Sequence, residues 1–308
     1  MRVTDTLLAR GLLLLAGLVL ASCSHTTAVV SPPVTVPTAP DSGFYHFSVN
    51  ATNLPKLSQG AGTYTLWLRL HDSSYRSAPL TFNYTTSTST IFSGRVQVMV
   101  DSVISAAISL ETSNAAMTPS AVIIAGRFNA PTGLDTLLAD APEGIGDYST
   151  AKGSVFFTTQ NADDTARAHH EFYLMRDSAG QMVSSLRNLG DAPEGWTYGV
   201  WLVNDHAYPA RHVFYGAFTH PGGPDSRATG DSFPFPGGYD PGTLEDPAAS
   251  IILSLDLTVL DSRPSPAAPG PFTVLSLPLS RFLSAGEVRT MTAPWYFNQL
   301  RAILSLYK

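Results

Sequence analysis

The sequence predicts an all-β protein with two tandem antiparallel β-sandwich domains. From residue 42 onward, short runs of alternating apolar residues are separated by Gly, Pro, Asn and Asp. Only 14% of the residues are charged and 44% are hydrophobic, with many Thr, Ser, Val, Tyr and Phe, a composition typical of strands. Several short motifs also occur twice in the same order, which indicates a duplication.

The alternation predicts individual strands along the chain. In the run 63–70, Tyr64, Leu66 and Leu68 fall on one face, and in 94–100 Val96 and Val98 do the same. Further strands are predicted at 106–110, 121–125, 153–159, 171–175, 198–203, 213–218, 251–258 and 272–277. A helical period of 3.6 residues appears only weakly, at 297–306. Many short strands with turns between them favour antiparallel sandwiches over a fold of alternating strands and helices.

The N-terminal segment predicts export from the cytoplasm. Arg2 and Arg10 flank a short charged start, and the apolar run 11–20 is too short for a permanent membrane span. The residues Leu20-Ala21-Ser22-Cys23 follow, with the only cysteine of the chain. They resemble the lipobox of bacterial lipoproteins, which implies a signal peptide at 1–22 and a lipid anchor, including palmitate, on Cys23. The alternative is an ordinary secretory cleavage site with the cysteine there by chance.

A tether is predicted to follow the anchor. Residues 23–41 contain the lipidated cysteine and then a Pro/Thr-rich stretch, which favours an extended spacer because proline cannot join a sheet ladder. Ser24 stands where an aspartate would follow the cysteine, which favours sorting to the outer membrane if the host is Gram-negative. We therefore expect a protein of the cell envelope that contacts the membrane through its lipid.

The charge of the chain argues against nucleic acid as a partner. Removal of residues 1–22 leaves 16 Lys and Arg against 23 Asp and Glu, a formal charge of −7. Nucleic-acid binding requires a basic face, and the same acidity disfavours electrostatic docking on anionic lipid.

The duplicated motifs set the expected domains. Leu54-x-x-Leu57 and then Tyr64-x-x-Trp67 recur as Leu186-x-x-Leu189 and Tyr198-x-x-Trp201; Phe92-Ser-Gly94 is matched with Phe214-Tyr-Gly216, and Ser105–Glu111 with Ser250–Asp256. We expect immunoglobulin-like sandwiches at 42–133 and 150–293, the second with a long loop at 221–247, and a C-terminal tail at 294–308. Tyr64, Trp67, Tyr198 and Trp201 are expected to form the core common to the two copies.

The second copy also resembles a known extracytoplasmic domain. The segment 189–203, with Trp196, Tyr198 and Trp201, is similar to a strand-opening motif of the C-terminal domain of the anti-sigma-K (RskA-type) family; the first copy matches only around Tyr64 and at Ser109-Leu-Glu111. This resemblance implies a β-sandwich. It does not imply anti-sigma activity, which belongs to a cytoplasmic zinc-type helical domain that has no counterpart in this sequence.

The sequence contains no complete catalytic set, so we expect no enzyme activity. Gly230-Asp231-Ser232 is similar to the nucleophile block of GDSL-type hydrolases, but prolines follow at once and no helix can begin there. Ser149 and Lys152 have the spacing of a serine–lysine pair, but the partner motif Lys-Thr-Gly is missing.

Two groups of side chains remain as candidate binding residues. His206, His212 and His220, with Asp205 nearby, offer nitrogen and oxygen ligands that suit zinc, but their spacing matches no recognised site, so we expect neither a metal nor a cofactor. Acidic residues of the Gly/Pro loop, including Asp231 and Asp240, are equally weak candidates for calcium. A surface contact is considered for the aromatic residues Trp196, Tyr208 and Tyr239.

These observations predict a non-enzymatic envelope lipoprotein whose paired sandwiches have a binding or structural role. The ligand would be an unknown protein or glycan. Two alternatives remain: a carbohydrate-binding or adhesion module that uses loop aromatics, and a hydrolase that uses the histidines of 206–220.

Overall fold

The described part of the chain consists of β-strands in antiparallel sheets, which confirms the predicted all-β fold. The computed structural model describes residues 44–57, 61–80, 89–112, 116–129, 132–159, 170–178, 181–206, 210–222, 249–258, 268–279, 286–294 and 299–307. The predicted signal peptide, Cys23 and tether lie outside these residues. Within them, no helix is long and apolar enough to cross a membrane, and a short 3₁₀ turn spans Val100–Ser102.

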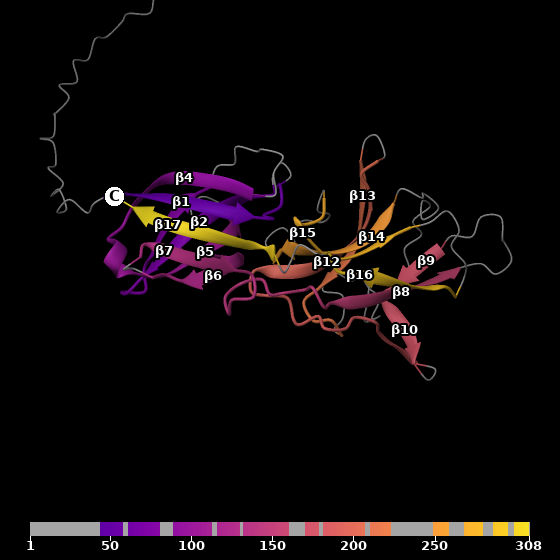
Figure 1. Ribbon diagram of the computed structural model, residues 1–308. Helices are drawn as coiled ribbons and strands as arrows, with labels where there is room; N and C mark the ends of the chain where they lie inside the picture. The colour runs from indigo at the N-terminus through magenta and orange to yellow at the C-terminus, as the bar shows by residue number, and fades with distance from the viewer. Residues whose placement is uncertain are drawn as a thin grey trace, which may run out of the picture. The chain divides into compact units, whose positions relative to one another are not determined.

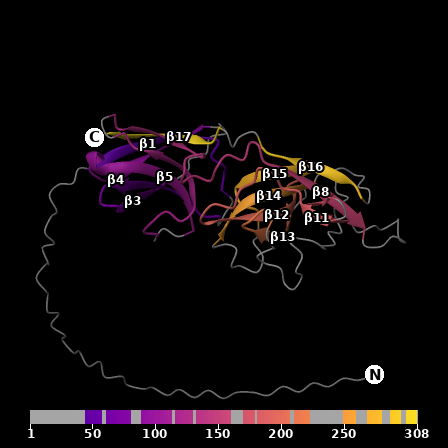
Figure 2. The same cartoon turned by 90° about the horizontal axis from the view of Figure 1, so that it is seen from below.

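The first sheet has eight strands and curls so that its end strands come into contact (Figures 1 and 2). In spatial order the strands are β3 (Tyr75–Pro79), β2 (Thr63–Leu70), β5 (Val103–Glu111), β6 (Val122–Arg127), β7 (Leu134–Leu138), β17 (Arg301–Tyr307), β1 (Phe44–Thr52) and β4 (Ser89–Gln97).

The second sheet has seven strands and is built from the middle of the chain (Figure 1). In spatial order the strands are β13 (Arg211–Phe218), β12 (Trp196–Asn204), β14 (Ser250–Leu257), β15 (Phe272–Pro278), β16 (Val288–Thr292), β8 (Lys152–Thr159) and β9 (His170–Tyr173). The strands β10 (Met175–Ser178) and β11 (Gln181–Ser184) form a separate hairpin.

Five neighbouring strands have the same arrangement in both sheets. The order β3-β2-β5-β6-β7 corresponds to β13-β12-β14-β15-β16. Trp67 lies opposite the third residue of the motif that begins at Ser105, and Trp201 lies opposite the third residue of the motif that begins at Ser250. A β-bulge interrupts both ladders at the matching step, before Ser109 and before Ser254. Trp67 and Trp201 therefore occupy corresponding places.

One of the four sequence matches does not correspond in the structure. Phe92-Ser-Gly94 lies on β4, which pairs with β1, whereas Phe214-Tyr-Gly216 lies on β13, which pairs with β12. The strand that corresponds to β13 is β3. Phe-x-Gly is a short pattern, and the similarity of these two segments does not reflect a shared position.

The C-terminal segment, expected to be a tail, contains a central strand of the first sheet. β17 pairs with β1 on one side and β7 on the other, and Figure 1 shows it, in yellow, beside the indigo β1. Ala302, Leu304 and Leu306 are buried because they alternate toward the core. The weak helical period at 297–306 was thus misleading. The boundary expected at residue 133 also precedes β7, which belongs to this sheet.

A single apolar core joins the two sheets. Tyr64 on β2 and Tyr198 on β12 belong to one cluster of buried residues, and residues 42–308 form one compact unit. A direct bond also crosses between the sheets, because the indole N–H of Trp196 donates to the carbonyl of Val122 at 3.1 Å. Trp67 and Trp201 are buried as well, but they lie outside this cluster because they alternate to the other face of their strands.

Candidate functional site

Each tryptophan that alternates away from the core is linked to a buried carboxylate, Trp201 directly and Trp67 through a serine. Trp201 donates its indole N–H to Asp256 Oδ2 at 3.0 Å, and the hydroxyl of Ser254 donates to Asp256 Oδ1 at 2.6 Å. Because strand residues two apart share a face, the motif Ser-Leu-Asp places the serine and the acid beside the tryptophan of the neighbouring strand. The sequence therefore builds a local polar cluster within an apolar sheet.

The first sheet carries a related cluster with a longer acid. Trp67 donates its indole N–H to Ser109 Oγ at 2.7 Å, and this hydroxyl donates in turn to Glu111. Glu111 also accepts the backbone N–H and the hydroxyl of Ser120. The extra methylene of glutamate moves the carboxylate away from the indole, and the serine bridges the distance.

In the second sheet, this cluster also positions a loop. Asp256 Oδ1 accepts the backbone N–H of Gly270 at 2.7 Å. A Cβ atom at Gly270 would overlap the carbonyl of Leu255 and lie 2.6 Å from Asp256 Oδ1, so only glycine permits this approach. The bond holds segment 268–271 against the face of the sheet, where Pro269 and Pro271 become the wall of a pocket.

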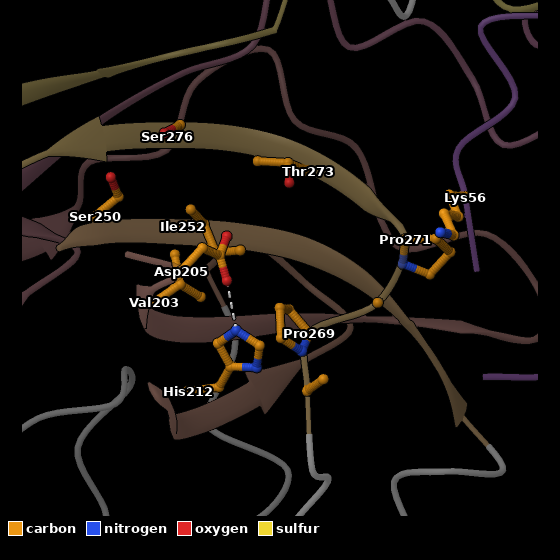
Figure 3. A pocket seen from close by; sticks show the side chains of 12 residues that line it. Lys56, Val203, Asp205, His212, Ser250, Ile252, Pro269, Pro271, Thr273 and Ser276 are labelled. Atoms are coloured by element: carbon orange, nitrogen blue, oxygen red, sulfur yellow. Dashed lines mark hydrogen bonds and ion pairs between the residues drawn. The ribbon is translucent and has the colours of Figure 1, made fainter. Parts of the chain in front are cut away.

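The pocket lies on the face of the second sheet that carries Trp201 and has a volume of about 420 Å³ (Figure 3). β12, β13, β14 and β15 supply its floor and sides, the loop before β15 supplies a wall, and the segment after β1 reaches it with one residue. The lining residues are Lys56, Val203, Asp205, His212, Ser250, Ile252, Ala268, Pro269, Gly270, Pro271, Thr273 and Ser276.

An imidazole and a carboxylate are in direct contact within the pocket. His212 Nε2 lies 2.8 Å from Asp205 Oδ1, drawn as the dashed line in Figure 3. The His212 side chain is 21% exposed and that of Asp205 is 74% exposed, so the carboxylate remains open to solvent while the ring is largely covered. Their strands bring them together, because His212 pairs with Val203 at the end of β12, two residues before Asp205.

The structure separates the three histidines considered as metal ligands. His220 Nδ1 lies 2.8 Å from Asp191 Oδ1, and the backbone N–H of His206 donates to the side chain of Asn204. His212 alone lines the pocket. Among the described residues, no group of three or more His, Cys, Asp or Glu side chains is arranged to hold a metal ion. The acidic residues of the Gly/Pro loop lie outside those residues.

The aromatic surface contact considered for Trp196 is wrong. Its side chain is only 2% exposed and packs edge-on against Phe272, with ring centroids 5.6 Å apart. Gly195, at a φ of +82°, turns the chain so that the indole enters the core instead of solvent. Tyr208 and Tyr239 lie outside the described residues, as does Ser232. Ser149 forms a local turn by bonding to Asp147.

Most residues of the pocket carry no signal that sequence reasoning could use. The sequence analysis places Asp205 and His212 together, but as potential metal ligands; in the structure the two side chains are in contact. Lys56, Ser250 and Ser276 come from three distant parts of the chain, and each is an ordinary polar residue beside a strand or on it. Only the strand pairings bring them to one face.

Comparison of the chain with protein-family models, with curated proteins and with solved structures gives no match.

Proposed function

We propose that this protein is a cell-envelope lipoprotein that binds a small polar ligand in the pocket on its second sheet and catalyses no reaction. Cys23 would carry the lipid, and the tether at 24–41 would separate the folded part from the membrane. Two or more acyl chains give stable anchoring where one is marginal. If the host is Gram-negative, the anchor would lie in the outer membrane. The observation that carries the binding role is the pocket itself, with the Asp205–His212 pair inside it.

The composition of the pocket supports binding over catalysis. A hydrolase that used His212 to activate a serine or threonine would need that hydroxyl within hydrogen-bonding reach of the ring. Among the described residues, no serine or threonine hydroxyl bonds to His212, whose Nε2 faces Asp205. Polar groups from several strands that converge on a partly apolar concavity of this size are typical of ligand sites.

The anchor is tested by metabolic labelling. Growth with an alkyne analogue of palmitate should label the wild-type protein, and Cys23→Ala should abolish the label because no other residue offers a thiol. The variant should also leave the membrane fraction. Persistent labelling of Cys23→Ala at wild-type intensity would contradict the anchor, whatever the pocket binds.

The binding role is tested by thermal shift. The purified full chain is screened against sugars, sugar acids, amino acids and small carboxylates, since a ligand that binds only the folded state raises the melting temperature. A hit should lose its shift in Asp205→Asn and in His212→Gln. His206→Gln is the matched control, because His206 does not line the pocket. A compound that raises the melting temperature of all three variants as much as that of the wild type would bind outside the pocket.

A further inference from the structure

One face of the first sheet gathers exposed apolar side chains. Of the eight large apolar side chains that are most exposed in the described part of the chain, five lie on this face: Ile91 on β4, Leu134 and Leu138 on β7, and Ile303 and Tyr307 on β17. These strands and β1 are neighbours in the sheet (Figure 1). The alternate residues of the same strands are buried in the core. We call the solvent-facing side of β7, β17, β1 and β4 the β1 face.

The strand pairings place the apolar side chains of the β1 face close together. Ile303 lies opposite Asn50, which lies opposite Ile91, so the two isoleucines flank one small polar side chain. Leu134 and Leu138 are diagonal neighbours of Ile303, because they flank its direct partner on β7. Apolar side chains that gather on one face, instead of being scattered singly, mark an interaction surface.

The charged groups of the β1 face are basic. Arg95 on β4 and Arg301 on β17 are exposed, and His46 on β1 stacks on Tyr307 with ring centroids 5.7 Å apart. The solvent-facing positions of the four strands contain no Asp or Glu. In the described part of the chain, no carboxylate pairs with either arginine. The β1 face is therefore positive, although the chain after residue 22 has a formal charge of −7.

This distribution of charge matters more than the total. The total charge disfavours docking on anionic lipid, but at physiological ionic strength an exposed charge acts over only about 8 Å. An anionic surface that contacts the β1 face therefore meets mainly Arg95 and Arg301. A second copy of the chain fits less well, because a face paired with itself brings arginines toward arginines and offers no carboxylate on either side.

We propose that the β1 face docks on the surface of a phospholipid bilayer with anionic headgroups. The arginines pair with lipid phosphates, Tyr307 lies at the level of the headgroups, and the isoleucines and leucines contact the acyl chains beneath them. The proposal rests on the lipid anchor of the proposed function. Residues 24–41 lead directly to β1, a middle strand of this face, and extend to about 60 Å at most, so an anchor on Cys23 keeps the face near the bilayer.

The proposal is tested with residues 24–308 and phospholipid vesicles, so that neither a signal peptide nor a lipid contributes. Residues 42–308 form one compact unit with its own core, which permits this truncation. In co-sedimentation, the chain should bind vesicles of phosphatidylglycerol and phosphatidylcholine at least about 10-fold more tightly than vesicles of phosphatidylcholine alone. Added salt should reduce this preference.

Arginine variants locate the electrostatic contact. Arg95→Gln and Arg301→Gln should each weaken binding to the mixed vesicles about 5-fold, the effect of one basic side chain at an anionic surface. Arg211→Gln is the matched control, because Arg211 is exposed on β13 of the second sheet. Binding by both β1-face variants as tight as that of the control would overturn the proposal.

Apolar variants locate the insertion. The double variant Ile91→Ala and Ile303→Ala should weaken binding to the mixed vesicles about 3- to 10-fold, because less apolar surface enters the bilayer. Val288→Ala is the control, since Val288 is 55% exposed on β16 of the second sheet. Thermal melts monitored by circular dichroism confirm that each variant is folded.

Two other results would overturn the docking surface. The first is a wild-type chain that binds neither kind of vesicle. The second is a concentration-dependent dimer in sedimentation velocity that the double isoleucine variant abolishes, which would assign the β1 face to a second copy. Neither result touches the anchor, which the palmitate label on Cys23 tests separately, or the pocket, which the thermal-shift screen tests.

Discussion

Asp135 carries a carboxyl group that points into the first sheet, beside Leu137 on β7. Its side chain is 8% exposed, and Oδ2 has no hydrogen-bond partner among the described residues. The carboxyl lies over Gly126, where a Cβ atom would be 2.9 Å from Oδ1. Burial raises the pKa of Asp135 from 3.8 to about 7 because the charged form loses hydration. The folded protein therefore holds this proton more tightly than the unfolded chain does.

This pKa predicts that Asp135 destabilises the protein at neutral and higher pH. Below about pH 4 both states are protonated; as the pH rises toward 7, the unfolded state ionises first, so stability falls and then levels off. Asp135→Asn should be unaffected by this loss and should be about 1–3 kcal/mol more stable than the wild type at pH 8. Urea unfolding at pH 4, 6 and 8 measures the difference. Asp101→Asn, at an exposed position, is the control; a gain that does not change with pH would contradict the assignment.

Truncation of either tryptophan outside the main core, Trp67 or Trp201, is expected to destabilise the protein. Trp201→Ala should cost about 3–5 kcal/mol of unfolding free energy, because the side chain is fully buried and its loss removes the indole N–H that donates to Asp256 Oδ2. Trp67→Ala should cost a similar amount, since Trp67 has the corresponding register and a related polar partner. Chemical denaturation measures both. A loss below about 1 kcal/mol in either variant would show that its position is not part of the scaffold.

Single residues show where sequence reasoning succeeds and where it fails. Tyr64 and Tyr198 were expected in the core and are fully buried there, since each follows a clear alternation. For Trp196, a surface contact is a possible reading of the sequence, because this residue lacks a counterpart in the first copy. Its burial depends on Val122 and Phe272, contacts made by distant strands that leave no local signal.

At the level of elements, β17 connects two parts of the first sheet. β7 and β1 each pair with it, so the pair of β1 and β4 reaches the rest of the ladder through this strand. Leu304→Ala should cost about 2–5 kcal/mol because Leu304 is completely buried. Ile303→Ala, one residue away and 50% exposed, should change stability by less than about 0.5 kcal/mol. Denaturation of both variants tests the strand, because similar losses would contradict the alternation.

Two of the strands that sequence reasoning missed, β7 and β17, have a blurred alternation of polar and apolar residues. β7 buries Asp135 and exposes Leu134 and Leu138, the reverse of the usual pattern. β17 has apolar residues on both faces, with Ile303 and Tyr307 exposed, so its alternation is blurred. Strands with one polar and one apolar face, such as β4 in its Phe92–Gln97 stretch, give a cleaner signal. For the other strands, pairing with segments far away in the sequence decides which face of the strand is buried.

At the level of the whole molecule, the pocket depends on parts of the chain far apart in sequence. Asp256 on β14 accepts a hydrogen bond from Gly270 in the loop before β15, and Lys56 reaches the second sheet from the segment after β1. The fold class could be predicted because composition and alternation are properties of each strand alone. The pocket could not, because its chemistry is assembled by strand order and by a core that continues through both sheets.

The most direct test of the account is a crystallographic screen of the protein with small polar fragments, which maps binding without assuming a ligand class. We expect small polar fragments to gather in the pocket, with their polar atoms on Asp205 or His212. The same screen of Asp205→Asn should lose the fragments on that residue and keep any others. Fragments that gather on another surface while the pocket binds none would contradict the central claim that this pocket is the binding site.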